Sequence, residues 1–336
     1  MSTTAAIPHA VAHPDPPGDA GDPHTWVRRY TRAHHENFSV LSWLLPRRLR
    51  GDFAAVYAFC RWSDDLADDA ESPEAALEAL REWRVQLEAC LADRLSNDAH
   101  PIFRALRHTI TRHDLPGSPF HDLLDAFEMD QRITRYDTYD QLLGYCRLSA
   151  NPVGRLVLML GGYRDTPDHQ QRFAYADATC TALQLINHVQ DVRRDVLERD
   201  RVYLPQDVAM QHGLDVEHLA RMIQSDAQAH PPGEAECSAC VTGSAGLSAL
   251  APAYRATLAD LCDRIETLFA EGRKLWPMLD PASGIVRPVQ AFTLGGEAVL
   301  RRVRQMNFDT PRRRPRLSKA TKAGLLFRVA TGATGR

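Results

Sequence analysis

The sequence predicts an all-α fold, organised as a single-domain helical bundle. From residue 25 to residue 228, apolar residues recur at intervals of three and four, which is the period of a helix with one buried face. Breaks in this pattern coincide with Pro or Gly clusters at residues 44–48, 71–75, 114–120, 149–154 and 163–168. The chain has no strand–helix alternation, no Gly-rich phosphate loop and no internal repeat. Its 336 residues are 44% hydrophobic and 25% charged, with a net charge of −3, as in an ordinary globular protein.

The two ends of the chain differ from this helical region. Residues 1–24 are rich in Pro, Ala, Gly and His and lack the basic start and apolar core of a secretory signal, so we expect a disordered leader. The helical domain then covers residues 25–310, with a flexible insertion at 229–247, and a basic tail follows at 311–336. No apolar run approaches the roughly 18–20 residues of a membrane span, which favours a cytoplasmic protein.

The seven cysteines do not form a disulfide framework, because their number is odd and their spacing irregular. Five lie in helix-like apolar stretches and are expected to be reduced core residues: Cys60, Cys90, Cys146, Cys180 and Cys262. Cys237 and Cys240 lie in the insertion without a second pair of ligands, so a surface loop is favoured over a zinc site.

The first candidate site is a polar stripe on an otherwise apolar helix. Tyr57, Arg61, Asp64 and Asp68 are spaced by four, three and four residues, so a helix places them on one face. An acidic cluster at a helix end is usually a solvated surface. Here, however, the preceding residues FAAVYAFC are too apolar for an exposed helix.

A second stripe repeats this design further along the chain. Gln184, Asn187, Asp191 and Asp195 are spaced by three, four and four residues, while the apolar residues between them occupy other faces. Four polar side chains in register would be costly to bury without partners. Two such stripes on facing helices of a bundle would repel each other unless cations lay between them.

Carboxylate oxygens combined with substrate phosphates favour magnesium as the cation. The two stripes therefore predict Mg²⁺ and a diphosphate at the rim of a cavity in the bundle core. Magnesium would neutralise the diphosphate leaving group and promote formation of a carbocation, and an apolar cavity would limit its premature quenching. Arg61 is the candidate for binding the phosphate oxygens.

The motifs resemble those of the squalene/phytoene synthases, a family with the class I isoprenoid synthase fold. The resemblance covers roughly residues 30–310 and is found in YAFCRWSDDLAD, QLINHVQDVRRD, the following RVYLP and the segment MDQRITRYDTYDQLLGYC at 129–146. Each motif alone is moderately specific, and their common order and spacing make the resemblance strong.

Departures from the usual family pattern point to a subgroup. The chain has HHENFSVLSWLLPRR at 34–48 and YCRLSANPVGRLVL at 145–158, where phytoene and squalene synthases usually have a Ser-rich segment and a VAGTVG-like stretch. It also has Gln190 where an Arg often precedes the Asp of the second motif. These features are similar to bacterial hydroxysqualene synthases of hopanoid pathways, which ionise presqualene diphosphate, rearrange the cation and let water capture it without NADPH.

The resemblance also implies roles for individual residues. The magnesium–diphosphate residues would be Asp64, Asp68, Asn187, Asp191 and Asp195. Tyr57 would face the cation or a proton in transit, and Gln184 would line the pocket. Asp65 and Asp69 are expected either to support the metal residues or to face solvent. Tyr203 would close over the site or merely cap a helix.

Two further segments are expected to lie at the substrate. His35, Glu36 and Asn37 replace the family's serines and are candidates for diphosphate contact or water placement, although His34 and His35 also fit a surface pair at a helix start. Asn151, with Pro152 and Gly154, would break a helix beside the cavity or form a plain turn between helices.

Several alternatives remain at this point. The chain could condense two farnesyl diphosphates to presqualene diphosphate or squalene, or it could be a scaffold that retained the fold without catalysis, although all four aspartates are present. Arg301–Lys322 contains nine basic residues and one acidic residue, which suits either a solvated tail or an anionic membrane surface. The segment lacks the interleaved aromatic residues of a nucleic-acid binder, so no nucleic acid is expected. Whether a presqualene diphosphate synthase is a partner is open.

Overall fold

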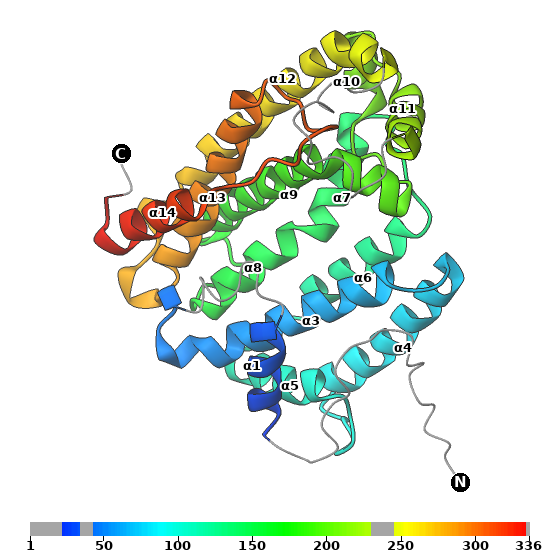
Figure 1. Cartoon of the computed structure of the whole chain (residues 1–336). Helices are drawn as coiled ribbons and strands as arrows, with labels where there is room; N and C mark the ends of the chain where they lie inside the picture. The colour runs from blue at the N-terminus through cyan, green and yellow to red at the C-terminus, as the bar shows by residue number, and fades with distance from the viewer. Residues whose placement is uncertain (1–21, 34–42, 230–244, 334–336) are drawn as a thin grey trace. The chain divides into compact units, whose positions relative to one another are not determined.

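The computed structural model describes residues 22–33, 43–229 and 245–333, and these residues are predominantly helical (Figure 1). They contain no β-strand, and Arg135 and Val202 form an isolated parallel bridge. The prediction of an all-helical single domain is therefore confirmed. Within these ranges, no helix is both long enough and apolar enough to cross a membrane.

Tertiary contacts divide the chain into two compact units, each assembled from segments that are distant in sequence. Unit 1 comprises Met1–Arg132, Asn151–Ala176 and Trp276–Val289. Unit 2 comprises Ile133–Ala150, Asp177–Leu275 and Gln290–Arg336. Because the chain passes repeatedly between them, the units are not successive domains.

Unit 1 is built around one central helix, α3, which contacts α1, α4, α5, α6 and α8. The helices are α1 (Pro23–Ala33), α3 (Arg50–Asp68), α4 (Pro73–Leu91), α5 (Pro101–His113), α6 (Ser118–Asp130) and α8 (Asn151–Leu160). Aromatic rings fill the space between them, with Trp83 4.2 Å from Phe103 and Phe59 6.0 Å from Phe103 between ring centroids. The indole N–H of Trp83 donates to Ser63 Oγ at 2.9 Å, so its polar atom is satisfied within this apolar core.

Short 3₁₀ turns connect some of these elements, at Arg47–Leu49, Trp276–Met278 and Pro281–Ser283. The start of α4 coincides with the capping residue and proline that the sequence shows there. The Ser72 side chain accepts a hydrogen bond from Ala75 N, and Pro73 occupies the first turn of α4, as the sequence predicts.

Unit 2 contains most of α9 (Gln170–Arg199), together with α7, α10, α11, α12, α14 and most of α13. Their bounds are α7 (Tyr139–Ser149), α10 (Gln206–Gln211), α11 (Val216–Ala229), α12 (Ala245–Arg273), α13 (Val286–Gln305) and α14 (Lys319–Thr331). Gly296 allows α13 to pack closely on its neighbours, because a Cβ there would lie 2.5 Å from Phe269 Cζ on α12 and 2.6 Å from Leu183 Cδ2 on α9.

The proposed leader and insertion lie largely outside the described residues, which leaves residues 1–21 and 230–244 without a structural account. Cys237 and Cys240 fall in the second of these gaps. The other five cysteines lie on helices, where Cys90, Cys146 and Cys262 are buried. The basic tail is described as far as residue 333, and it includes the helix α14.

Candidate active site

The first polar stripe lies on the C-terminal half of α3, which runs from Arg50 to Asp68. Its members Tyr57, Arg61, Asp64 and Asp68 are all half-buried, whereas the residues between them on the other faces are mostly buried. Arg61 Nη1 donates to Asp64 Oδ2 at 3.2 Å. The structure thus supports the expected common face, and it places the arginine next to the first of the two aspartates.

Asp65, which lies next to Asp64 on α3, holds Arg61 of this stripe in place. Its side chain is only 3% exposed, so it does not face solvent. It accepts a hydrogen bond from the Tyr30 hydroxyl at 3.0 Å and forms an ion pair with Arg61. Arg61 is therefore held between two carboxylates, which fixes the direction of its guanidinium. Asp69, by contrast, is exposed at the end of α3.

Tyr57 is half-buried on the same face, and burial raises the pKa of its phenol. The hydroxyl therefore keeps its proton throughout the neutral pH range.

The second stripe lies on α9 within unit 2. Gln184, Asp191 and Asp195 are half-buried, and Asn187 is exposed. The apolar residues of the same helix segment point into the core of the unit; these are Leu185, Ile186, Val189, Val192 and Val196. The helical period thus separates a polar stripe from a buried apolar face, as the sequence predicts.

Asp195 is the member of this stripe whose pKa is shifted most clearly. Burial, reinforced by the negative charge of Asp191, raises the pKa of Asp195 to about 7, although Arg199 and Arg194 act in the opposite direction. Two carboxylates one helical turn apart are therefore difficult to ionise together. A divalent cation would remove this conflict, so the donor set fits magnesium.

Each motif supplies only part of a coordination shell. In the described part of the chain, no group of three or more His, Cys, Asp or Glu side chains is arranged to hold a metal ion. Taken alone, each stripe offers a pair of carboxylates. Magnesium commonly binds one or two carboxylates and completes its shell with water and substrate phosphates.

A basic residue from the C-terminal segment also reaches the second stripe. Arg314 Nη2 lies 3.0 Å from Asp191 Oδ2, and its Nε donates to the other carboxylate oxygen. Sequence analysis identified the basic segment but not this contact, because nothing in the local pattern links two residues so far apart in the chain.

A cluster of buried aromatic rings packs under the α9 stripe. The imidazole of His188 stacks on Tyr203 with 3.9 Å between ring centroids, and Tyr145 lies 5.5 Å from Tyr203. Burial lowers the pKa of His188 to about 3, so its ring is neutral at physiological pH. Tyr203 is thus buried within this cluster, and its proposed closure over the site stays a prediction. The cluster includes Tyr145 and Tyr136, which the sequence analysis did not identify as separate site residues.

The structure describes Asn151 but not His35 and Asn37, the other residues predicted to contact the substrate. Asn151 is buried and begins α8, while α7 ends at Ser149, so the helical path breaks at the single residue Ala150, with φ −123° and ψ −46°. The predicted break is confirmed, and the proposed contact of Asn151 with substrate stays a prediction. His35 and Asn37, with Glu36, lie outside the described residues.

Comparisons with known proteins place this all-helical fold and its two aspartate motifs in one class of proteins. The profile of the squalene/phytoene synthase family matches residues 31–239. The chain therefore belongs to the squalene/phytoene synthase family.

The chain is similar to individual members of this family with different names. The chain is 36% identical over 189 residues to a hydroxysqualene synthase of Zymomonas mobilis, covering 55% of this chain and 60% of that protein. It is 32% identical over 200 residues to a phytoene synthase of Arthrospira platensis, covering 57% and 63%. The matches thus span about three-fifths of the length of these curated relatives.

A solved structure extends the similarity over more of the chain. The crystal structure of squalene synthase HpnC from Alicyclobacillus acidocaldarius matches with a TM-score of 0.69 and 36% sequence identity, covering 85% of this chain and 94% of that one.

Proposed function

We propose that this chain is a hydroxysqualene synthase that converts presqualene diphosphate to hydroxysqualene with the help of magnesium. The observation that carries the magnesium–diphosphate assignment is the Asp191–Asp195 pair, two half-buried carboxylates one helical turn apart on α9. The choice of reaction is supported by the segments HENF and SANPVG and by relatives named hydroxysqualene synthase at 36–38% identity.

The residues proposed to hold magnesium are Asp64 and Asp68 on α3, and Asn187, Asp191 and Asp195 on α9. Bound magnesium would supply positive charge that neutralises the diphosphate as it leaves. Arg61, held by Asp64 and Asp65, presents a fixed guanidinium that can donate two parallel hydrogen bonds to phosphate oxygens. We assign diphosphate contact also to His35 and Asn37, and pocket lining to Gln184 and Asn151.

The reaction breaks the bond between carbon and the bridging diphosphate oxygen, and the electron pair leaves with the diphosphate. The cyclopropylcarbinyl cation rearranges, a water oxygen forms the new carbon–oxygen bond, and that water releases one proton. Tyr57 keeps its own proton at neutral pH, so we assign it the role of a neutral ring and hydroxyl facing the cation rather than that of a phenolate base.

The alternative within the family is the condensation of two farnesyl diphosphates to presqualene diphosphate or squalene. The similarity to a phytoene synthase supports keeping this alternative reaction in consideration. The name of that relative denotes a different product within the same family. If presqualene diphosphate is the substrate, a separate condensing enzyme must supply it.

A product assay distinguishes these functions. Purified protein with magnesium and without NADPH would receive presqualene diphosphate or farnesyl diphosphate separately, and the extracts would be resolved by mass spectrometry. We expect a squalene alcohol from presqualene diphosphate, with its oxygen labelled when the assay is run in H₂¹⁸O. Presqualene diphosphate formed from farnesyl diphosphate would instead assign the condensing step, and no product from either substrate would favour a scaffold.

We further propose that the protein works at the cytoplasmic membrane surface, where its lipid-soluble product would accumulate, and that α14 provides the contact. Ser318 caps the start of this helix, and its side chain accepts a hydrogen bond from Thr321 N at 3.0 Å. It exposes Lys319 and Lys322, and the Phe327 side chain is 69% exposed. Basic residues attract anionic lipid headgroups, and an exposed aromatic ring can enter the interface.

Charge and aromatic substitutions on α14 test this membrane role. The combined variant Lys319→Gln, Lys322→Gln and Phe327→Ser should bind anionic vesicles at least about tenfold more weakly, because each basic residue near the surface contributes about 1 kcal/mol. Activity on detergent-dispersed substrate should not change. Cosedimentation with vesicles containing phosphatidylserine gives the binding, and equal binding by the variant and the natural protein would refute the role. Point substitutions are preferable to truncation, because removing the whole tail would also remove Arg314.

A further inference from the structure

Between α13 and α14, residues 309–318 form a strap that passes along α9 within unit 2 (Figure 1), with a turn at 310–313 and no regular structure at 314–318. Before it, Asn307 and Phe308 both have a positive φ, of 51° and 59°, and they turn the chain out of α13. Such values are unfavourable for residues other than glycine. The surrounding contacts must therefore hold this turn and fix where the strap begins.

The first part of the strap is firmly anchored. Thr310 is buried, and its hydroxyl lies 2.5 Å from the buried hydroxyl of Tyr254. Arg193 Nη1 donates to the carbonyl oxygen of Pro311 at 3.1 Å and also binds Asp226 at 2.8 Å. The Thr310–Tyr254 hydrogen bond is buried and those of Arg193 are part-buried, so this part of the strap is expected to stay in place while more exposed contacts open.

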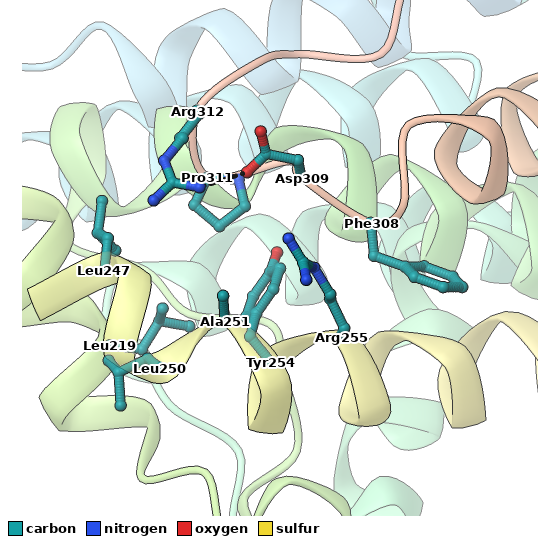
Figure 2. A pocket seen from close by; sticks show the side chains of 10 residues that line it. All are labelled: Leu219, Leu247, Leu250, Ala251, Tyr254, Arg255, Phe308, Asp309, Pro311 and Arg312. Atoms are coloured by element: carbon teal, nitrogen blue, oxygen red, sulfur yellow. Dashed lines mark hydrogen bonds and ion pairs between the residues drawn. The ribbon is translucent and has the colours of Figure 1, made fainter. Parts of the chain in front are cut away.

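Figure 2 shows a small pocket beside this part of the strap, where Pro311 and Arg312 lie over Ala251 and Tyr254 of α12. Arg312 Nη2 donates to Ser248 Oγ at 3.0 Å. Residues 309–312 are thus fixed by contacts with both α9 and α12.

The second part of the strap, residues 313–318, bonds to α9 at two residues, Gln190 and Asp191. Gln190 Nε2 donates to the carbonyl oxygen of Pro315. Arg314 forms a two-pronged ion pair with Asp191, in which Nε and Nη2 each donate to a different carboxylate oxygen. The Asp191 side chain is 16% exposed and that of Arg314 is 37% exposed, so the pair is accessible to ions from solution.

In this geometry, Arg314 and a metal ion would compete for the same carboxylate, that of Asp191. Arg314 occupies both oxygens of Asp191, and its positive charge lies where a cation bound to that carboxylate would also lie. A divalent cation that takes the same lone pair as Arg314 displaces one of the two hydrogen bonds, and one that takes the second lone pair of either oxygen repels the nearby guanidinium.

We propose that Arg314 is a latch that competes with the divalent cation for Asp191, and that metal binding releases residues 313–318 of the strap while residues 309–312 stay anchored. This inference rests on the proposed metal role of Asp191. If Asp191 binds the metal, metal binding at α9 also controls how tightly residues 313–318, which lead into α14, are held.

Manganese binding provides the first test, since Mn²⁺ takes the same carboxylate ligands as Mg²⁺ and its free form can be measured by electron paramagnetic resonance. Arg314→Gln should bind Mn²⁺ about three- to tenfold more tightly than the natural protein, a modest gain because the ion pair is partly exposed. Arg313→Gln is the matched control. It removes the same charge one residue earlier, from an exposed side chain with no hydrogen bond or ion pair to the described residues, and its affinity should change less than twofold.

The release of the strap is the second readout and does not depend on activity. Trypsin cleavage between the exposed Arg316 and Leu317 would be timed by the mass of the C-terminal fragment. Saturating Mn²⁺ should accelerate this cleavage at least severalfold in the natural protein. Arg314→Gln and Asp191→Asn should both be cleaved rapidly whether or not Mn²⁺ is added, because neither retains the ion pair.

The possible results distinguish failure of the proposed Arg314 latch from failure of the proposed metal role of Asp191. Mn²⁺ binding with no change in cleavage rate, or equal affinities of Arg314→Gln and Arg313→Gln, would overturn the latch and leave the metal assignment intact. Failure of the natural protein to bind Mn²⁺, either alone or with inorganic diphosphate, would overturn both.

Discussion

Asp64→Asn or Asp191→Asn should lower kcat/KM by about a thousandfold or more while the helical fold is retained. An asparagine keeps the shape of the side chain but removes the negative charge that binds a divalent cation, and a thousandfold loss corresponds to about 4 kcal/mol of transition-state stabilisation. Turnover of presqualene diphosphate would be measured at several magnesium concentrations, with far-ultraviolet circular dichroism confirming the helical content.

Asp69→Asn is the matched control for the α3 motif. It makes the same change in charge at the end of the same helix, but on an exposed side chain, so its turnover should stay within about twofold. Asp64→Asn leaves Arg61 paired with the buried Asp65, which protects the local structure. Near-normal turnover in both Asp64→Asn and Asp191→Asn would exclude the proposed metal ligands.

The parts of the site that could be predicted from sequence are those determined by helical period. Asp64 and Asp68 share a face of α3 with Arg61 because of their spacing alone, and the same holds for Asp191 and Asp195 on α9. Breaks were predictable where a residue excludes the helix or caps it, as Ser72 and Pro73 do at the start of α4.

Contacts between distant segments could not be predicted in this way. The hydrogen bond from Tyr30 to Asp65 joins residues 35 positions apart, and the pair of Arg314 with Asp191 joins residues 123 positions apart. Periodicity orients a side chain on its own helix but does not identify what packs against it. The basic character of the tail likewise suggested membrane attraction, whereas one of its arginines is committed to the α9 motif.

The unfolding free energy should depend on pH through Asp195, and it should fall as pH rises from about 4 to about 7 when divalent cations are removed. The folded-state pKa of Asp195 is raised to about 7 from an ordinary value of 3.8, first by burial and then by Asp191. Within this window the folded state therefore binds more protons than the unfolded state, so each rise in pH favours unfolding. A shift of this size corresponds to about 4 kcal/mol at most, and partial access of the side chain to solvent lowers the expected effect to roughly 2–4 kcal/mol.

Asp195→Asn isolates this contribution, because its amide does not ionise. At pH 8 without metal, the variant should be more stable than the natural protein by roughly 2–4 kcal/mol, and at pH 4 the two should differ little. Chemical denaturation followed by circular dichroism gives the comparison, and Glu198→Gln, an exposed carboxylate on the same helix, serves as the control with an effect below about 1 kcal/mol. Magnesium with inorganic diphosphate should stabilise the natural protein at pH 8 more than Asp195→Asn, because the variant lacks one of the proposed metal ligands and binds the metal more weakly. Parallel pH profiles for the natural protein and Asp195→Asn would show that the α9 carboxylates are not in conflict, and would remove the electrostatic reason for a cation at this motif.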